Sequence, residues 1–330
     1  MTVDTTTDAV ARDRLGALTA RARDELVRFL PLLIIAVLLV ALSLRNPDLL
    51  TVDSLLTMAD SAAPLLVLAA GATVVILCGG IDLSIGALAS FASVLLALWT
   101  PALSGWAAVP VIAVTAVAGV LQGWVHVAAR VPSFIVTLGG LSLWTGLALA
   151  LSGAKTVPIT DLSAFAWAFT RVRGLPSAIL VALALVAVIS AVMRLTPFGR
   201  WVCSIGHAES AARLAGLPVD RVKIAAFGIS GAAAGLAGLL LVARTFSGAP
   251  TLGDSLLLPA VAAVVVGGTA ITGGHGGLGK TVMGAFVVVL LRVGLSLIGV
   301  DAGVEPILYG ALIVIAVSVT IDRSKVAVMK

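Results

Sequence analysis

AAPLLVLAAGATVVILCGGIDLSIGALASFASVLLALW, residues 62–99, contains a single charged residue, Asp82. A helix needs about 20 mostly apolar residues to cross the roughly 30 Å of hydrocarbon in a bilayer, and apolar runs of about that length flank Gly79 and Gly80. The runs are continuously apolar and too long for the alternating strands of a membrane β-barrel. The stretch therefore predicts two membrane-spanning helices joined by a glycine turn.

The rest of the chain has the same character. Its 330 residues are 60% hydrophobic and 11% charged, with a mean hydropathy of +1.17, whereas a soluble domain carries about 25% charged residues. A water-soluble core cannot bury so much apolar surface, so the predicted fold class is all-α, a polytopic membrane protein. About ten spans are expected, at 29–45, 62–79, 83–100, 106–129, 132–152, 175–195, 223–243, 255–272, 281–299 and 304–321.

Basic residues predict the orientation, because cytoplasmic loops carry an excess of Lys and Arg. With the N-terminus in the cytoplasm, 15 basic residues fall inside and 5 outside, while Arg292 falls within a span. The excess favours both termini inside, and the net charge of +5 then gives no reason to expect a nucleic-acid partner. The two cysteines and three histidines show no disulfide framework and no metal-ligand spacing. The expected divisions are a cytoplasmic segment 1–28, a transmembrane domain 29–322 and a cytoplasmic tail 323–330.

The charge of Asp82 needs a partner, because a carboxylate in lipid is costly and is expected in a turn or a cavity. Gly79 and Gly80 end the preceding span, and Asp82 stands where a helix N-cap belongs, near the backbone donors around Ser84. The alternative interpretation is a broken helix that lines a transport path.

A second glycine turn, in GGTAITGGHGGLGKT (267–281), resembles the first. Spans 2–5 and 7–10 are therefore a possible internal repeat, as is common in transporters. Residues 274–281 also fit G-x-x-x-x-G-K-[ST], the loop that cradles nucleotide phosphates, but that loop needs a strand before it and a soluble domain around it. The favoured interpretation is a plain turn with Lys280 at the cytoplasmic surface. The glycines of this turn that we take as site residues are Gly273, Gly274 and Gly276.

The longest inside loop, 196–223, is the least hydrophobic stretch after the N-terminal segment. Within it, AESAARLAG predicts a short helix in which Glu209 and Arg213 pair at i,i+4 spacing. Gly216 suits the end of that helix, and Pro218 prevents its continuation. A helix of about nine residues is about 13 Å long, which suits insertion into a groove on another protein. The alternative is a connector that lies on the membrane surface.

Glu209-x-Ala211-Ala212-x-x-x-Gly216 resembles the EAA…G loop of bacterial ABC importer permeases, which docks onto the ATP-binding subunit. Over roughly 30–322 the chain is similar to the ribose-type sugar permease family of ABC importers, in the order of that family's blocks. The blocks are GGIDLSIGAL (79–88), VPSFIVTLGGL (131–141), TPFGRWVCSIGHAESAARLAGL (196–217), AAVVVGGTAITGGHGGLGKT (262–281) and GLSLIGV (294–300).

The resemblance implies the permease subunit of an ABC importer for a sugar or a similar small polar solute, in the bacterial cytoplasmic (inner) membrane. Its implied partners are a second permease subunit, identical or not, two ATP-binding subunits and an extracytoplasmic solute-binding protein. ATP would be bound and hydrolysed on the partner, so no cofactor and no enzymatic activity are expected of this chain. The loop 196–223 would couple the ATP-binding subunit to the permease. The implied contact residues are Glu209, Ala211, Ala212, Arg213 and Gly216.

Polar residues within the spans are candidates for the solute path, since aromatic faces and neutral hydrogen-bonding groups suit a sugar. The alternative is that they hydrogen-bond neighbouring helices. Arg292 is expected to pair with an acid such as Asp82, to reach the membrane interface or to meet an anionic solute. The candidates are Gln122, His126, Thr137, Trp144, Thr145 and Arg292.

Some positions depart from the family that the chain resembles, and these departures leave the identity of the solute open. Leu257 and Pro259 stand where many members carry acids, Gln122 replaces a common Asn, and Arg292 replaces a polar amide. Small residues are expected to let helices pack closely or move against each other. They are Gly231, Gly235 and Gly238 in one span and Gly139, Gly140 and Gly146 in another.

Two other functions are compatible with parts of the sequence. A secondary transporter driven by an ion gradient needs acidic residues at mid-membrane, for which Asp82 is the candidate. A membrane enzyme that hydrolyses nucleotides would use Gly274–Thr281.

Overall fold

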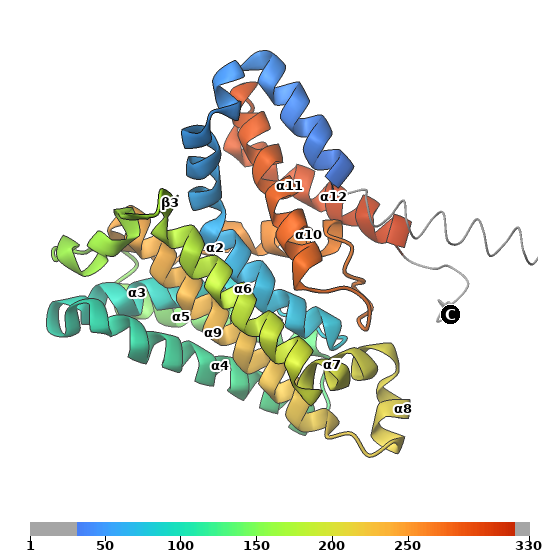
Figure 1. Ribbon diagram of the computed structural model, residues 1–330. Helices are drawn as coiled ribbons and strands as arrows, with labels where there is room; N and C mark the ends of the chain where they lie inside the picture. Colours follow the sequence, from blue (N-terminus) through green and yellow to red (C-terminus); the bar gives the residue numbers. More distant parts are fainter. Residues whose placement is uncertain (1–31, 321–330) are drawn as a thin grey trace, which may run out of the picture.

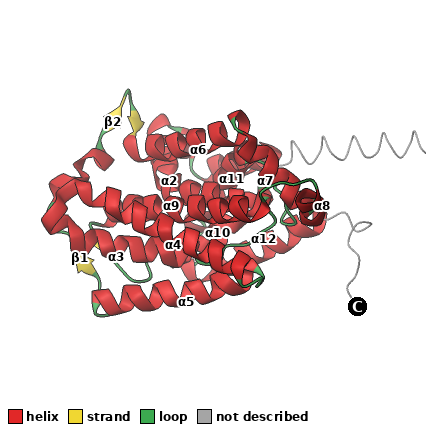
Figure 2. Cartoon of the chain, turned by 90° about the horizontal axis from the view of Figure 1, so that it is seen from below, coloured by secondary structure: helices red, strands yellow, loops and turns green. Residues whose placement is uncertain are grey.

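The computed structural model describes residues 32–320. Figure 1 shows these residues as a bundle of helices, and the few strands in Figure 2 are very short. The expected all-α fold is therefore observed over this range. The expected segments 1–28 and 323–330, and with them the location of both termini, lie outside the described residues.

The helices follow the apolar runs of the sequence, and short 3-10 turns separate several of them. The helices are Leu32–Arg45, α2 (Val52–Leu77), α3 (Ile85–Leu103), α4 (Ala108–Ala128), α5 (Ser133–Ser152), α6 (Ser177–Leu195), α7 (Pro197–His207), α8 (Glu209–Leu214), α9 (Val219–Thr245), α10 (Leu257–Val266), α11 (Leu278–Leu297) and α12 (Glu305–Thr320). The 3-10 turns are η1 (Pro47–Leu50), η2 (Ser104–Ala107), η3 (Leu162–Phe169), η4 (Asp254–Leu256) and η5 (Ala302–Val304).

Six segments of the described chain are long and apolar enough to cross a membrane. Five are single helices, and the sixth is the 44-residue stretch from α3 through η2 to α4. Three shorter apolar helices accompany them: Leu32–Arg45, Asp254–Val266 and Glu305–Ser318. Every expected span overlaps one of these apolar segments, so the polytopic character is observed, whereas ten complete crossings stay a prediction.

The expected span 255–272 is not one continuous helix. α10 has 10 residues, about 15 Å of helix, or roughly half of the hydrocarbon thickness. Before it, the chain enters the bundle along α3 as irregular backbone. The hydroxyls of Ser93 and Ser90 accept hydrogen bonds from the backbone N–H groups of Ala249 and Gly253, at 3.1 and 2.8 Å. Irregular backbone at membrane depth is tolerated where protein groups satisfy it in this way.

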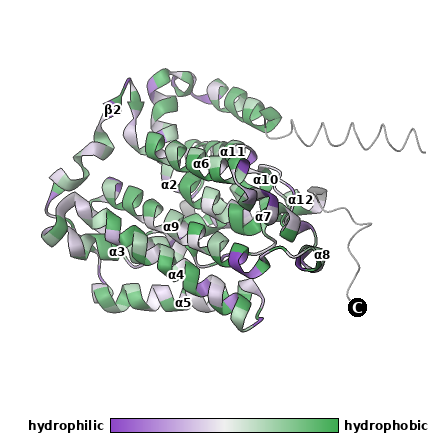
Figure 3. Ribbon diagram, turned by 60° about the horizontal axis from the view of Figure 1, so that its bottom comes forward, coloured by the Kyte–Doolittle hydropathy of each residue, from purple (hydrophilic) through white to green (hydrophobic). Residues whose placement is uncertain are grey.

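α2 forms the centre of the bundle (Figure 1). Its most apolar window is 89% buried, against 22% for the corresponding windows of α5 and α6, and it packs against α6, α9, α10 and α11. Hydrophobic residues also cover the outward faces of the surrounding helices, whereas hydrophilic residues gather around α7 and α8 (Figure 3). Helices that are apolar on both faces are expected where lipid surrounds the bundle.

The two ends of the bundle differ in structure. α6 and α9 run between them: α6 leads into α7, and α9 follows α8 and ends beside the strands. We refer to them as the α8 end and the strand end (Figure 2). The strands form two antiparallel pairs: β1 (Val157–Pro158) with β4 (Ser247–Gly248), and β2 (Arg171–Val172) with β3 (Leu175–Pro176).

Glycines set the close approach of α4 to α9. A methyl group at Gly231 would collide with the Thr115 carbonyl oxygen of α4, so the two backbones pack with no side chain between them. Gly139 and Gly146 on α5 differ from the expectation, because no atom lies within 4 Å of the position a Cβ would take. The other expected packing glycines, each with a close neighbour, are Gly140, Gly235 and Gly238.

We expect Gly231→Ala to destabilise the folded protein by about 1–3 kcal/mol, because an added methyl group forces two packed helices apart. The measurement is the thermal unfolding midpoint of the purified protein in detergent. Gly146→Ala is the matched control: it adds the same methyl group in open space and should leave the midpoint unchanged or slightly raise it. Equal effects of the two substitutions would contradict the packing role of Gly231.

Candidate functional site

α7 and α8 project from one end of the bundle (Figure 1). α7 begins at Thr196, whose Oγ1 accepts a hydrogen bond from the Phe198 N–H at 3.3 Å. α8 ends at Leu214, and Gly216, just beyond it, has a φ of +75°, in the left-handed region that favours glycine. The Leu217 N–H donates to the Ala212 carbonyl oxygen at 3.1 Å across this turn, which is a common way to end a helix. A short helix with its stop at Gly216 is therefore observed, but it has six residues instead of the expected nine or so.

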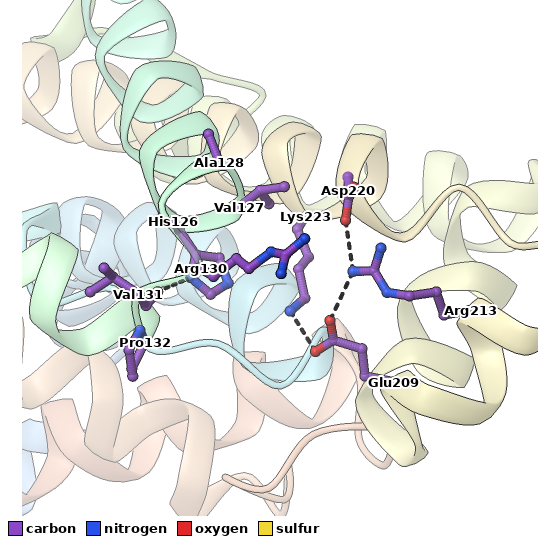
Figure 4. Close-up of a pocket in the computed structure, with 10 residues that line it drawn as sticks. All are labelled: His126, Val127, Ala128, Arg130, Val131, Pro132, Glu209, Arg213, Asp220 and Lys223. Atoms are coloured by element: carbon purple, nitrogen blue, oxygen red, sulfur yellow. Dashed lines mark hydrogen bonds and ion pairs between the residues drawn. The ribbon is translucent and has the colours of Figure 1, made fainter.

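Ion pairs tie α8 to the first turn of α9 (Figure 4). The Glu209 carboxylate lies 2.6 Å from Lys223 Nζ and 3.2 Å from an Arg213 guanidinium nitrogen, so the predicted pair of Glu209 and Arg213 is confirmed. Arg213 also lies 2.7 Å from the Asp220 carboxylate. The two acids and two bases alternate, so each charge has an opposite neighbour.

This network mainly fixes the orientation of α8. Burial alone would raise the pKa of Glu209, but hydrogen bonds and charges from Lys223 and Arg213 outweigh it and hold the pKa below its ordinary value. The carboxylate therefore stays ionised at neutral pH and keeps both pairs. Exposed ion pairs contribute only about 0–1 kcal/mol each, so the network contributes more to geometry than to stability.

A cavity of about 740 Å³ lies between this network and the turn from α4 to α5 (Figure 4). His126, at the end of α4, closes that turn: its Nδ1 lies 2.6 Å from the Val131 carbonyl oxygen. Arg130 adopts φ +55°, which is uncommon outside glycine, and its guanidinium lies at the cavity near Lys223 (Figure 4). His126, expected in the solute path, therefore lies at the α8 end and has a structural hydrogen bond.

The outer face of α8 is apolar and exposed. Leu214 is 91% exposed, and Ala211 and Ala215 beside it are exposed as well, whereas Ala212 packs inward. A shallow groove of about 420 Å³ runs between α7 and α8 next to this face. An exposed Leu on a six-residue helix that is fixed by ion pairs is suited to contact with another protein.

Behind α8, the end of α7 meets the second glycine turn. His207 Nε2 lies 3.0 Å from His275 Nε2, and a methyl group at Gly206 would collide with the Leu77 carbonyl oxygen and the Gly274 nitrogen. Those two atoms form a 2.9 Å hydrogen bond from Gly274 to the end of α2. α7, the glycine turn and α2 therefore meet at one point. The expected turn glycines Gly273, Gly274 and Gly276 all have positive φ there.

The Asp82 carboxylate hydrogen-bonds two serines. It accepts hydrogen bonds from the Ser84 N–H at 2.9 Å, the Ser84 hydroxyl at 2.6 Å and the Ser230 hydroxyl at 2.7 Å. The expected hydrogen bond from the backbone at Ser84 is observed, but the N-cap residue of α3 is Ser84 and not Asp82. Ser230 connects this turn to α9. Arg292 pairs with an acid, as one of the expectations had it, but this acid is Glu305, whose carboxylate lies 3.4 Å from Arg292 Nε, and not Asp82.

The turn between α2 and α3 begins at Gly79, with φ +80°, and α5 satisfies the backbone that follows. Ser133 Oγ accepts a hydrogen bond from the Ile81 N–H at 3.0 Å, and Thr137 Oγ1 accepts one from the Leu83 N–H at 3.1 Å. Thr137, expected in the solute path, is fully buried and holds this turn.

The remaining path candidates do not gather into one site. Gln122 is 6% exposed and packs against Gly140, and its side-chain amide has no hydrogen-bond partner among the described residues. Trp144 Nε1 and Thr145 Oγ1 on α5 are also buried without a hydrogen-bond partner among the described residues. Arg292 lies on α11 and lines a separate cavity.

Residues 274–281 do not have the surroundings of a phosphate-binding loop. The helix α10, and not a strand, precedes the turn. Thr281 Oγ1 lies 2.7 Å from Thr73 Oγ1 in a buried contact with α2, and Lys280 Nζ lies 3.4 Å from the Gly268 carbonyl oxygen. The segment therefore connects α10 to α11, as the plain-turn interpretation expects.

Comparison with known proteins gives a consistent picture. Residues 54–317 match the family model described as "Branched-chain amino acid transport system / permease component". The chain is 35% identical over 297 residues to the probable ABC transporter permease protein YphD of Escherichia coli, with 87% of each chain covered. It is 35% identical over 309 residues to the ribose import permease protein RbsC of Bacillus subtilis, covering 90% of this chain and 93% of the relative. It is 34% identical over 275 residues to the fructose import permease protein FrcC of Rhizobium meliloti, covering 79% and 76%. No solved structure matches.

We expect Gly206→Ala to break the hydrogen bond between Gly274 and Leu77 and to cost about 1–3 kcal/mol, since its methyl group collides with both atoms. Thermal unfolding in detergent measures the loss. Gly279→Ala, a helical glycine with nothing within 4 Å of its Cβ position, is the control and should unfold like the parent protein. An unchanged midpoint for Gly206→Ala would show that the junction is looser than described.

Proposed function

Because this chain belongs to the family described as "Branched-chain amino acid transport system / permease component", we propose that it is the membrane-spanning subunit of an ABC importer. Relatives named as ribose and fructose import permeases cover most of the chain, which supports a sugar or a similar small polar molecule as the solute. We place the protein in the bacterial cytoplasmic membrane, with the α8 end in the cytoplasm. Arg194, Arg200 and Arg221 at that end support this orientation.

The observation that carries the proposal is the exposed face of α8. In the proposed complex, Leu214 and its neighbours insert into a groove on an ATP-binding subunit, and the charged network around Glu209 keeps the helix at the required angle. Two such subunits, a second permease subunit and an extracytoplasmic solute-binding protein complete the importer. ATP is hydrolysed on the partner subunits, so this chain is a transport subunit and not an enzyme.

Two contacts transmit a displacement of α8 to the bundle. The ion pairs from Arg213 and Glu209 connect α8 to α9. The end of α7, at Gly206 and His207, connects it to the glycine turn and so to Leu77 at the end of α2. α2 and α9 pack against each other in the centre of the bundle, so closure of the ATP-binding subunits would reorient both helices together.

The two alternative functions have less support. An ion-coupled transporter would need an acid that is free to bind its ion, but three hydrogen bonds from Ser84 and Ser230 already engage Asp82. A nucleotide-hydrolysing enzyme would need the Thr281 hydroxyl to bind the metal ion of the nucleotide, but this hydroxyl contacts Thr73.

We expect Leu214→Gln to weaken co-purification with the ATP-binding subunit by about tenfold, as for an interface hot spot of roughly 1.4 kcal/mol or more. Solute uptake in cells should fall with it, while the amount of protein in the membrane stays unchanged. Leu195→Gln is the matched control, because Leu195 is 83% exposed at the end of α6, before α7 begins. Unchanged association and unchanged uptake of Leu214→Gln would remove the docking role of α8.

The purified chain without its partners should hydrolyse ATP no faster than the background, because residues 274–281 lack a phosphate-binding arrangement. Release of phosphate from ATP by the protein in detergent is the measurement. Lys280→Ala should also leave solute uptake by the complete transporter nearly unchanged. Hydrolysis that disappears in Lys280→Ala would support the enzyme instead.

A further inference from the structure

A second cavity lies toward the strand end, on the side of the bundle away from α8. Its volume is about 500 Å³, within the range of roughly 300–1,000 Å³ that is usual for small-molecule sites. It is enclosed by the first half of α2, the end of α9, the start of α10, the second half of α11 and the start of α12. α9 runs from α8 to Arg244 over 27 residues, about 40 Å, so this cavity and the α8 surface are far apart. Figure 1 shows the start of α2 beside α11 and α12.

The N-terminal end of α10 lies at this cavity. α10 begins part-way through the bundle, where the preceding backbone is held by Ser90 and Ser93 of α3. Ser255, in η4, and Pro259, in the first turn of α10, line the cavity.

The polar groups of the cavity are only loosely paired. Arg292 Nε and the Tyr309 hydroxyl each lie 3.4 Å from the Glu305 carboxylate, and Arg244 lies 3.1 Å from the Ser61 hydroxyl. Charge-assisted hydrogen bonds are normally about 2.7–2.9 Å long. Each guanidinium has five N–H donors, so donors and acceptors are left for a bound molecule.

Each cation that lines the cavity has a carboxylate nearby. Arg292 faces Glu305, which also lines the cavity, and Arg244 faces Asp60 at 3.8 Å, just outside the lining. An anionic solute would need an unmatched positive charge, whereas a neutral solute with many hydroxyl groups can both donate to the Glu305 carboxylate and accept from the guanidiniums. Tyr309 adds an aromatic ring next to Glu305, and Leu65 and Leu241 give the cavity an apolar side.

We propose that this cavity is a solute-binding site of the permease itself and that it takes a neutral, polyhydroxylated molecule of monosaccharide size. Arg292 and Glu305 hydrogen-bond its hydroxyl groups, and Tyr309 contacts its ring. The inference rests on the proposed function and names the place and the chemistry of solute recognition within it.

Accessibility of an engineered cysteine tests the site in the complete transporter in cells. Ser296→Cys, which lines the cavity and is exposed, is labelled with a membrane-impermeant maleimide added outside. D-ribose or D-fructose should slow labelling by roughly twofold once half of the sites are occupied. Gluconate and inorganic phosphate should not. Ser163→Cys, which is exposed on η3 outside the cavity, should be labelled at the same rate with and without sugar.

Substitutions then connect protection to the named groups. Glu305→Gln and Arg292→Gln should each raise the sugar concentration needed for protection by about tenfold, because a charge-assisted hydrogen bond is lost. Labelling without sugar should be unchanged, which shows that the variants fold. Arg171→Gln is the matched control, because Arg171 pairs with Asp53 at 2.8 Å on the surface near the strands, outside this cavity.

The inference is overturned if Ser296→Cys is not labelled from outside, if neither sugar protects it, or if the anions protect it as well as the sugars. It is also overturned if Glu305→Gln and Arg292→Gln behave like Arg171→Gln. The Leu214→Gln experiment tests the proposed function separately. If Leu214→Gln leaves association unchanged while sugars still protect Ser296→Cys, the α8 contact is wrong and the solute site is supported. If Leu214→Gln weakens association but no sugar protects Ser296→Cys, the importer is supported and this site is wrong.

Discussion

Backbone that leaves a helix and stays buried must find its hydrogen bonds in the protein, because an unpaired buried N–H or C=O group is costly. This requirement determines how the bundle is assembled at three places. Ser133 and Thr137 of α5 satisfy the turn between α2 and α3. Ser90 and Ser93 of α3 satisfy the irregular chain that leads to α10. The Leu77 carbonyl of α2 accepts a hydrogen bond from the second glycine turn. Each break in one helix therefore fixes the position of another.

Hydroxyl side chains suit these positions because they add a donor and an acceptor without a charge. Asp82 is the exception, because it carries a charge. Its carboxylate accepts three hydrogen bonds, from the N–H and hydroxyl of Ser84 and from the hydroxyl of Ser230 on α9, which offset the cost of burying that charge. Glycines complete the arrangement, because they let α4 and α9 touch and let the end of α7 reach the Leu77 carbonyl. The bundle is thus held by short-range polar contacts and backbone proximity, as expected where lipid provides no hydrophobic driving force between helices.

The sequence predicted what depends on neighbouring residues. The apolar runs locate the helices, Gly216 locates the end of α8, and Glu209 pairs with Arg213 one turn away. What the sequence did not show depends on residues far apart along the chain. His207 and His275 are 68 residues apart in sequence but in contact in the fold. Arg292 pairs with Glu305 on the next helix and not with Asp82. The expected span 255–272 was too long at its C-terminal end, because α10 stops at Val266 and a turn at Gly267 and Gly268 follows, where Gly268 has φ +91°.

The burial of α2 has a consequence for biogenesis. The ribosome makes α2 long before α9, α10 and α11, which supply much of its surroundings in the finished bundle. Until then this helix is surrounded by lipid, which suits its most apolar 18-residue window, with a mean hydropathy of 1.9. During assembly, the later helices then displace lipid from the surface of α2. This helix is therefore made early and covered late.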